Sequence, residues 1–469
     1  MLRRTKIVAT LGPACSEASI LQAMLAAGVN VLRINFSHAD SNLFHIVEKA
    51  RAIANELNHP LAIIADLQGP KLRIGRFKDN QITLVNGQYF TLNCSSQELG
   101  DEQSVSVAYT NLCYELTAGD HLLLDDGLIE LKVETIAPPL IHCVVIEGGV
   151  LRNNKGLNRK GGGLAARALT EKDKKDLQTA IDLQVDYLTL SFVKDARDIQ
   201  EARDLMKGKA IPIIAKIERT EALHHLVEII NATDAVMVAR GDLGVEIGPA
   251  EVPAIQKKII EQSRRLDKVV ITATQMMESM VYQPQPTRAE VSDIANAILD
   301  GTDAVMLSAE TATGKFPVKV IKMVDSICRS AEKHAGFFYN VDNESCHYQR
   351  ADQAIAMATM HAANHFPIKA IVALTESGAT AIWMSRQQSI VPIYAVTANV
   401  RTVGKLSLVN NVFPIYLDYH RLEDDTVNEQ VFNFLIQMDF LIKGTFVLLT
   451  RGHKIGKPGG TNCMQIIKV

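Results

Sequence analysis

Short apolar runs alternate with longer amphipathic segments through most of this chain, and no other feature of the sequence constrains the fold as strongly. Helical patterns separate most of the runs, at Ser19–Ala27, Phe44–Leu57, Glu171–Leu183, Ala250–Leu266 and Arg288–Leu299. The runs themselves predict eight buried strands, at Lys6–Thr10, Val31–Asn35, Ala62–Asp66, Tyr187–Ser191, Ile211–Lys216, Ala235–Ala239, Val269–Ala273 and Ala304–Leu307. Eight strands alternating with helices indicate an α/β fold, a closed (β/α)8 TIM barrel, with a doubly wound open sheet as the alternative.

The alternation breaks between residues 71 and 167, where strand–turn–strand patterns replace it. Asn86-Gly87 separates two short apolar runs, which is typical of a β-hairpin, and Asp125-Asp126-Gly127 separates two more. We therefore expect an all-β lid domain at residues 71–167, inserted after the third strand between the barrel segments 1–70 and 168–336. An insertion at the carboxyl end of a strand lies over the active face of a barrel.

A third region begins at about residue 337 and is expected to form a C-terminal α/β regulatory domain, residues 337–469. Its patterns predict a helix at Ala351–His365 and strands at Ala370–Thr375, Ile393–Val396 and Thr445–Leu449. The segment Thr375–Thr380 follows a strand and opens a helix, and backbone amides at a helix start can bind phosphate together with nearby hydroxyls. A helix that is merely well capped is the other interpretation.

Charge and cysteine content exclude several classes of partner. The formal net charge is −3 over 469 residues, so no strong field attracts nucleic acid or a membrane surface. No apolar run reaches the length of about 18 residues that a membrane-spanning helix needs. The seven cysteines show no metal-binding spacing, which fits a reducing compartment. We expect a cytoplasmic protein without nucleic-acid or membrane partners.

Polar residues gather where the predicted strands end, whereas the strand interiors are apolar. The clusters are Arg33 to His38, Asp66, Lys216 with Glu218, Arg240 to Asp242, Thr274-Gln275 and Ser308 to Glu310. One such cluster is explained by a structural ion pair or a helix cap, but six on one face favour a functional site. Among these residues, carboxylates suit Mg²⁺, cationic groups suit a phosphoryl group in transfer, and a hydroxyl can pass a proton or cap a helix.

Seven segments, in order through the barrel, resemble the signatures of the pyruvate kinase family. They are Thr5–Pro13, Arg33–His38, Ala215–Glu218, Met237–Glu246, Ile271–Met280, Pro286–Val291 and Asp303–Ala312. The inserted lid and the C-terminal domain also match that family, so the resemblance covers essentially the whole chain. It is greatest to the bacterial class that nucleoside or sugar monophosphates activate.

The resemblance implies a glycolytic phosphotransferase that converts phosphoenolpyruvate and ADP to pyruvate and ATP, with Mg²⁺ as cofactor and Mn²⁺ as an alternative. It also implies a homotetramer and a phosphorylated allosteric effector. The implied roles fall into four groups. Catalysis and substrate binding are implied for Arg33, Lys216, Gly241, Asp242, Thr274, Ser308 and Glu310, and metal binding for Glu218 and Asp242. Nucleotide binding is implied for Asn35, His38, Arg73 and Lys172, and binding of the effector phosphate for Thr375, Ser377, Gly378 and Thr380.

One departure from the family pattern concerns the monovalent cation. Many members bind K⁺ through side chains like those of Asn35, Ser37 and Asp66, followed by a Thr and a Glu, but this chain has Leu67 and Lys71 in the last two places. We expect the ammonium group of Lys71 to lie near Asn35, Ser37 and Asp66 in place of the ion. K⁺ is therefore predicted not to be required.

Two other functions remain open at this stage. A metal-dependent aldolase also arranges a Glu and an Asp around Mg²⁺, although the lid, Arg33 and Thr274 weigh against it. A sensor of phosphorylated metabolites without catalytic activity is the second, and the presence of Lys216 and Glu218 weighs against that.

Overall fold

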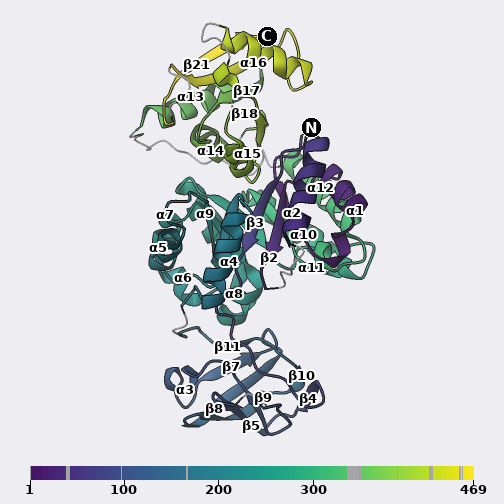
Figure 1. Ribbon diagram of the computed structural model, residues 1–469, viewed down its shortest axis with the longest axis vertical. Coiled ribbons are helices and arrows are strands. Elements are labelled where there is room, and N and C mark those ends of the chain that lie inside the picture. The colour runs from purple at the N-terminus through teal and green to yellow at the C-terminus, as the bar shows by residue number, and fades with distance from the viewer. Residues whose placement is uncertain are drawn as a thin grey trace.

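Three bodies lie in a row along the long axis of the computed structural model, with the barrel in the middle, the C-terminal domain at one end and the lid at the other (Figure 1). The structure describes residues 2–37, 43–96, 98–164, 167–334, 348, 350–387, 389–421, 426–453, 456 and 458–469. The expected boundaries near 167 and 336 fall beside residues outside these ranges and stay predictions. In the described part, no helix is both long and apolar enough to cross a membrane.

Eight parallel strands close into a barrel, which confirms the predicted fold and makes the open-sheet alternative wrong. Around the barrel they run β1 (Lys6–Thr10), β16 (Ala304–Leu307), β15 (Val269–Ala273), β14 (Ala235–Ala239), β13 (Ile213–Ile217), β12 (Tyr187–Leu190), β3 (Ala62–Asp66) and β2 (Val31–Asn35). Closure is evident at β1, where Val8 pairs with Val31 on one side and with Met306 on the other.

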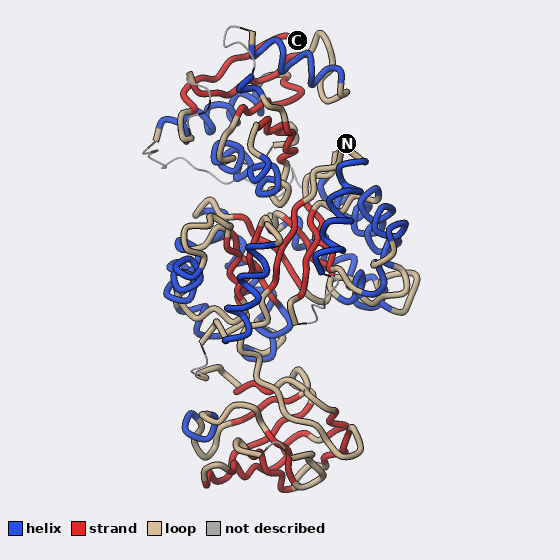
Figure 2. The backbone as a smooth tube through the Cα atoms, viewed as in Figure 1, coloured by secondary structure: helices blue, strands red, loops and turns tan. Residues whose placement is uncertain are grey.

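Helices surround this barrel on its outside (Figure 2). They are α1 (Ala18–Ala26), α2 (Leu43–Glu56), α4 (Glu171–Asp182), α5 (Ala196–Leu205), α6 (Thr220–His224), α7 (Leu226–Ala232), α8 (Arg240–Ile247), α9 (Val252–Arg265), α10 (Arg288–Leu299), α11 (Ala309–Ala312) and α12 (Pro317–His334), with short 3-10 turns η1 (Pro13–Cys15) and η2 (Glu278–Val281). Thr170 and Thr287 begin α4 and α10 with reciprocal capping boxes, which satisfy amides that a helix start leaves free.

The lid carries its own apolar core and two sheets. Its elements are β4 (Gln81–Leu84), β5 (Tyr89–Asn93), β6 (Ser104–Ser106), α3 (Leu112–Glu115), β7 (His121–Leu124), β8 (Ile129–Ala137), β9 (Leu140–Glu147), β10 (Gly149–Arg152) and β11 (Leu157–Arg159). The large sheet has the order β11-β7-β8-β9-β5-β6, and β10 pairs with β4 in a second sheet. The short helix α3 is the exception to an all-β composition.

Of the two hairpins that the lid sequence suggested, one is confirmed and one is wrong. Strands β7 and β8 pair across Asp125-Asp126-Gly127, whereas β4 and β5 belong to different sheets. A two-residue hairpin turn of the type that Asn-Gly favours needs a positive φ at both positions. Gly87 has φ 83°, but Asn86 is not among the residues with positive φ, so the chain passes from one sheet to the other at this turn.

The C-terminal domain is a five-stranded sheet with helices. Its elements are α13 (Ala351–His365), β17 (Ile368–Leu374), α14 (Ala379–Arg386), β18 (Ile393–Thr397), α15 (Val400–Leu406), β19 (Val412–Tyr416), the 3-10 turn η4 (Tyr419–Arg421), α16 (Val427–Gln437), β20 (Phe446–Gly452) and β21 (Thr461–Lys468). The strand order is β19-β18-β17-β20-β21, with only β21 antiparallel to its neighbour.

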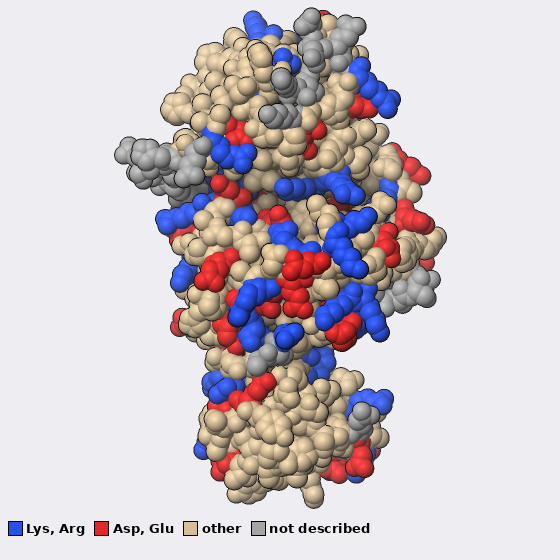
Figure 3. All heavy atoms as spheres, turned by 60° about the vertical axis from the view of Figure 1, so that its left-hand side comes forward, with Lys and Arg blue, Asp and Glu red and all other residues tan. Residues whose placement is uncertain are grey.

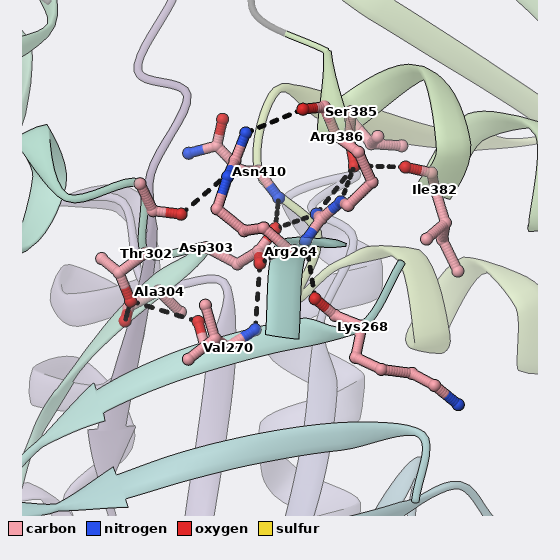
Figure 4. A network of polar contacts seen from close by, with 12 residues as sticks. Arg264, Lys268, Val270, Thr302, Asp303, Ala304, Ile382, Ser385, Arg386 and Asn410 are labelled. Atoms are coloured by element: carbon pink, nitrogen blue, oxygen red, sulfur yellow. Dashed lines mark hydrogen bonds and ion pairs between the residues drawn. The ribbon is translucent and has the colours of Figure 1, made fainter. Parts of the chain in front are cut away.

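This domain covers the end of the barrel at which the strands begin, and a buried ion pair joins the two bodies (Figure 4). Asp303 directly precedes β16 and binds the guanidinium of Arg386 at the end of α14. Its carboxylate also accepts hydrogen bonds from the amides of Val270 and Asn410, each at 2.9 Å. Tyr187, at the start of β12, donates a 2.8 Å hydrogen bond to the carbonyl of Lys405 in α15. The interior of the barrel is thereby continuous with the core of the C-terminal domain.

Candidate active site

The predicted catalytic and metal-binding residues lie at the opposite end of the barrel, where its strands finish; we call this end the barrel mouth. The lid lies beyond it (Figure 1). Contacts between lid and barrel occur here, since the amide of Gly161 donates to the carbonyl of Glu246 at 3.2 Å and that of Gly163 to Glu221 at 2.7 Å. Over the barrel, on the face seen in Figure 3, Lys and Arg side chains are interspersed with Asp and Glu, so this face has no continuous basic surface.

Arg33 and Asp66 form a buried pair at the ends of two adjacent strands. Arg33 lies in β2 and Asp66 ends β3. In the register of these two strands, Asn35 is opposite Asp66 and Arg33 is opposite Ile64. The guanidinium Nε of Arg33 donates to Asp66 Oδ2 at 2.7 Å, and its Nη1 donates to the hydroxyl of Thr10 at 3.0 Å. These contacts orient a cation that is buried at the barrel mouth.

Lys216 extends this network to the opposite side of Asp66. Its ammonium lies 2.7 Å from Glu218 Oε1 and 3.8 Å from Asp66 Oδ1, and it donates to the hydroxyl of Ser191 at 2.9 Å. Burial lowers the pKa of Lys216, but the charges of Asp66 and Glu218 outweigh burial, so the net shift is upward. Lys216 is therefore held as a cation in a region that water hardly reaches.

Glu218 and Asp242 provide the carboxylates of the candidate metal site. Burial raises the pKa of Glu218 and the charge of Asp242 adds to the rise, whereas Lys216 opposes it. A second oxygen of Glu218 accepts a 2.7 Å hydrogen bond from the amide of Phe192, which has φ 56°. The described residues contain no group of three or more His, Cys, Asp or Glu side chains that could hold a metal ion. Two carboxylates fit Mg²⁺, which is commonly bound by one or two of them together with substrate oxygens.

Thr274 and Gly241 meet as expected at the ends of β15 and β14. The Gly241 amide donates to Thr274 Oγ1 at 3.0 Å, and that hydroxyl donates to the carbonyl of Ala273 at 2.7 Å. Thr274 has φ 69°, a left-handed conformation that is rare for a β-branched residue and concentrates at functional sites. Buried Arg240 supports the turn, because it binds Asp293 at 2.7 Å and donates to the carbonyl of Thr274.

Ser308 and Glu310 lie at the end of β16, but their contacts are structural. Buried Glu310 accepts hydrogen bonds from the amides of Ser308 at 2.6 Å and Met277 at 3.1 Å. Neither residue has a hydrogen bond to Thr274 in the described part of the chain. Glu310 thus positions the turns after β15 and β16, and a direct part in proton transfer for either residue stays a prediction.

The four predicted nucleotide-binding residues are only partly brought together. Lys172 donates to the carbonyl of Phe36 at 2.8 Å and therefore lies beside the segment that holds Asn35. Arg73 belongs to the lid, where it donates to the carbonyl of Asn154 at 2.9 Å. His38 lies outside the described residues.

The expected position of Lys71 is wrong in this structure. Its ammonium binds Asp242 Oδ1 at 2.6 Å and lies 3.9 Å from Asp126 Oδ1 in the lid, rather than beside Asn35, Ser37 and Asp66. The reason is electrostatic, because the carboxylate of Asp66 already forms ion pairs with two cationic side chains. A third cation is attracted more strongly to Asp242.

The sequence argument missed three residues that orient the network, namely Thr10, Ser191 and Phe192. Ser191 and Phe192 follow β12, and Thr10 ends β1, so each is placed as the predicted clusters are. Their position at the ends of strands could have indicated them. A single uncharged hydroxyl or backbone amide, however, does not distinguish a site residue from an ordinary residue at a strand end.

A second candidate site lies in the C-terminal domain around the segment Thr375–Thr380, which we call the effector cradle. A cavity of about 30 Å³ is lined by Thr375, Glu376, Ser377, Thr380, Arg451 and Thr461, among others. Gly378 has φ 79° and its amide donates to the hydroxyl of Thr375 at 3.0 Å. The hydroxyls of Thr380 and Thr461 are 2.9 Å apart, so this part of the cradle is already hydrogen-bonded.

Comparison with known families agrees with this arrangement. The family model described as "Pyruvate kinase, barrel domain" matches residues 2–321, and the one described as "Pyruvate kinase, alpha/beta domain" matches residues 353–467. The chain belongs to the pyruvate kinase family. The pyruvate kinase of Buchnera aphidicola subsp. Baizongia pistaciae is 48% identical over 478 aligned positions, which cover 100% of this chain and 99% of the relative.

Two further relatives extend this likeness to other bacteria. Pyruvate kinase II of Salmonella typhimurium is 44% identical, with 100% of this chain and 99% of the relative covered. The pyruvate kinase of Haemophilus influenzae is also 44% identical, with 96% of each covered. The pyruvate kinase family consists of phosphotransferases, and the buried cations and carboxylates at the barrel mouth are groups that such chemistry uses.

Proposed function

We propose that the protein transfers the phosphoryl group of phosphoenolpyruvate to ADP, giving pyruvate and ATP, and that it requires Mg²⁺, which Mn²⁺ can replace. The observation that carries this proposal is the network at the barrel mouth, in which Arg33 and Lys216 converge on Asp66 while Glu218 and Asp242 lie beside them. Phosphoryl transfer is catalysed mainly by positioning and by charge, and this network supplies both.

Arg33 and Lys216 are proposed to bind the phosphoryl group while it moves. The negative charge of its oxygens needs donors that are already oriented, and Asp66 and Thr10 orient Arg33 for this purpose. The raised pKa of Lys216 keeps it protonated at neutral pH, so it can also stabilise the enolate that remains after transfer.

Glu218 and Asp242 would hold the divalent cation, together with oxygens of the substrate. When bound, the cation polarises those oxygens as a Lewis acid. The Gly241 amide and the Thr274 hydroxyl are proposed to bind the substrate carboxylate, since the two groups lie 3.0 Å apart at the adjoining strand ends. Thr274 would then help to deliver a proton to the enolate.

Nucleotide binding is proposed to use Asn35, His38, Arg73 and Lys172, with the lid closing over the barrel mouth. Of these residues, Lys172 and the segment of Asn35 form one side of the mouth and Arg73 comes from the lid. Exclusion of water by the closed lid would protect the phosphoryl group from hydrolysis.

We also propose that the enzyme needs no K⁺. Asp66 is already bound by two cationic side chains, and Leu67, the next residue, is buried and apolar and offers no side-chain oxygen to an ion. Lys71 pairs with Asp242 and adds a further ammonium group to the barrel mouth. A monovalent ion beside Asp66 would meet the two cations that already pair with this carboxylate, in a region of low dielectric.

The effector cradle is proposed to bind the phosphate of an activating monophosphate through Thr375, Ser377, Gly378 and Thr380. Its support is the cavity at the start of α14, where backbone amides and hydroxyls are available to an anion. Assembly as a homotetramer and a cytoplasmic location remain proposals that follow from family likeness alone.

A coupled assay tests the main proposal. Purified protein with phosphoenolpyruvate, ADP and Mg²⁺ should produce pyruvate and ATP in equal amounts. Pyruvate formed without ATP, or from an aldol substrate in place of phosphoenolpyruvate, would support the aldolase alternative. Binding of phosphorylated metabolites without turnover under Mg²⁺ and Mn²⁺ would support the sensor.

A further inference from the structure

Arg451 is a charged residue in the effector cavity to which the sequence argument assigned no role. It lies near the end of β20, and the cavity is bounded by this strand end, by the start of α14 and by Thr461. Among the described residues that line the cavity, Arg451 is the one cation and Glu376 the one anion. The two would be expected to pair, but they do not.

Glu376 is instead bound by two residues of η4. Its Oε1 accepts a 2.6 Å hydrogen bond from the hydroxyl of Tyr419, and His420 Nε2 lies 3.2 Å from the same oxygen. The carboxylate is therefore satisfied by η4 and does not neutralise Arg451. These contacts also weaken the repulsion that Glu376 would exert on a phosphate in the cavity, because its carboxylate is already hydrogen-bonded.

Correspondingly, one nitrogen of the Arg451 guanidinium has no acceptor among the described residues. Its Nη1 is buried, and the described residues provide no acceptor within hydrogen-bonding distance. A buried donor without an acceptor costs about 1–3 kcal/mol, and more when the group is charged. A cost of this kind is typical of a site that is completed by a ligand.

We propose that Arg451 binds the phosphate of the effector, and that the ligand group is a phosphate monoester dianion. This inference rests on the proposed effector function and names the residue that recognises its charge. The fork of guanidinium donors matches two phosphate oxygens, and the hydroxyl of Ser377 and the amides at the start of α14 can reach the third. A cavity of about 30 Å³ holds a single small group, so the phosphate enters it and the remainder of the ligand lies at the opening.

The test compares R451M, R451K and a control variant in the full-length enzyme. R401M is the control, because Arg401 is an exposed arginine of the same domain that does not line the cavity. Calorimetric titration measures the affinity for glucose 6-phosphate, ribose 5-phosphate, AMP and inorganic phosphate, which separates sugar, nucleoside and free-phosphate sources. Activation by each probe and basal activity are measured in parallel.

R451M should weaken binding of the recognised monoester about 10- to 100-fold, which corresponds to the loss of a charge-assisted contact. R451K should fall between wild type and R451M, because an ammonium keeps the charge but not the fork. R401M should bind as wild type does, and basal activity should be the same in all variants.

Unchanged affinity in R451M would overturn the role of Arg451. The effector site itself would still stand if S377A combined with T380A abolished binding. If no probe binds the wild-type enzyme, the effector site and this inference both fail. Should R451M not fold, R451K decides the matter, because equal affinity in R451K and wild type would contradict recognition by the guanidinium fork.

Discussion

At the scale of single residues, the barrel mouth is organised by charge more than by shape. Asp66 holds two cations, and a third, Lys71, pairs with the neighbouring carboxylate of Asp242. With Glu218, which pairs with Lys216, the three cations face three carboxylates, so the network is close to electroneutral and offers an anionic substrate oriented cations rather than a net positive charge. It follows that removing one charge should affect the transition state more than the folded state.

Lys216→Met should lower kcat by about three orders of magnitude or more, while the affinity for phosphoenolpyruvate changes little. The reason is that the ammonium acts on charge that develops during transfer. Steady-state kinetics with direct binding measurements will check this. Lys175→Met, at an exposed position of α4, is the matched control and should behave as wild type. A Lys216→Met enzyme that retains more than about a tenth of wild-type kcat would exclude Lys216 from the mechanism.

Thr274→Val should slow protonation of the enolate more than phosphoryl transfer. Valine keeps the β-branched shape at φ 69° and removes only the hydroxyl that contacts Gly241. Exchange of solvent deuterium into pyruvate measures protonation alone, and the full reaction measures phosphoryl transfer and protonation together. Equal slowing of the two would mean that Thr274 positions the substrate and does not pass the proton.

The monovalent cation provides a third test at this scale. The enzyme should have nearly equal activity in Na⁺, K⁺ and tetramethylammonium at matched ionic strength, and Leu67→Thr with Lys71→Glu should create a K⁺ requirement. The double change removes the ammonium that pairs with Asp242 and restores oxygen ligands at the two positions where family members that bind K⁺ have a Thr and a Glu. Strong stimulation of the unmodified enzyme by K⁺ would contradict the proposal.

At the scale of elements, buried parallel strands could be predicted from sequence because both of their faces are covered, and they appear as continuous apolar runs. Six of the eight predicted barrel strands match the structure at both ends, β2 and β14 among them. The hairpin predicted at Asn86-Gly87 was wrong because the sequence indicates a turn but does not show which strand the next strand pairs with. The partner of Lys71 was equally hidden, since it depends on how far Arg33 and Lys216 already satisfy Asp66.

Asp186 connects two elements and makes the stability depend on pH. It precedes β12, accepts a 2.7 Å hydrogen bond from the amide of Ile63 in β3, and lies against Gly404 of α15. Burial raises the pKa of Asp186 to about 6. The folded state therefore binds more protons than the unfolded state between about pH 4 and pH 6, and its stability falls as pH rises through that window.

Asp186→Asn should remove this penalty, because an amide can keep the hydrogen bond without a charge. The variant should be more stable than wild type by about 1–3 kcal/mol above pH 6, and the difference should vanish below about pH 4. Urea unfolding at several pH values will measure it. A difference that grows towards low pH would have the wrong sign and would contradict the argument.

At the scale of the whole molecule, the barrel and the C-terminal domain are joined by a core that crosses between them and by the pair of Asp303 and Arg386. Arg386→Met should lower the free energy of unfolding by about 3–5 kcal/mol, because Asp303 would then be buried without its counter-charge. Arg264→Met is the comparison, since Arg264 donates to the carbonyls of Gly301 and Arg386 at the same interface.

Scanning calorimetry should show this difference as a larger loss of thermal stability in Arg386→Met than in Arg264→Met. The weakened interface should also let the C-terminal domain unfold in a separate transition. Equal stability of the two variants would mean that the apolar core alone holds the domains together.

The C-terminal domain covers the end of the barrel at which the strands begin, and this limits where small molecules can enter and leave. Among the described residues, apolar side chains fill the barrel interior up to the C-terminal domain, so reactants and products are expected to exchange at the barrel mouth. If the lid closes over the barrel mouth as proposed, it has to open once for every molecule of ATP that is released. The frequency of that opening would then set an upper limit on turnover, however fast the chemical steps are.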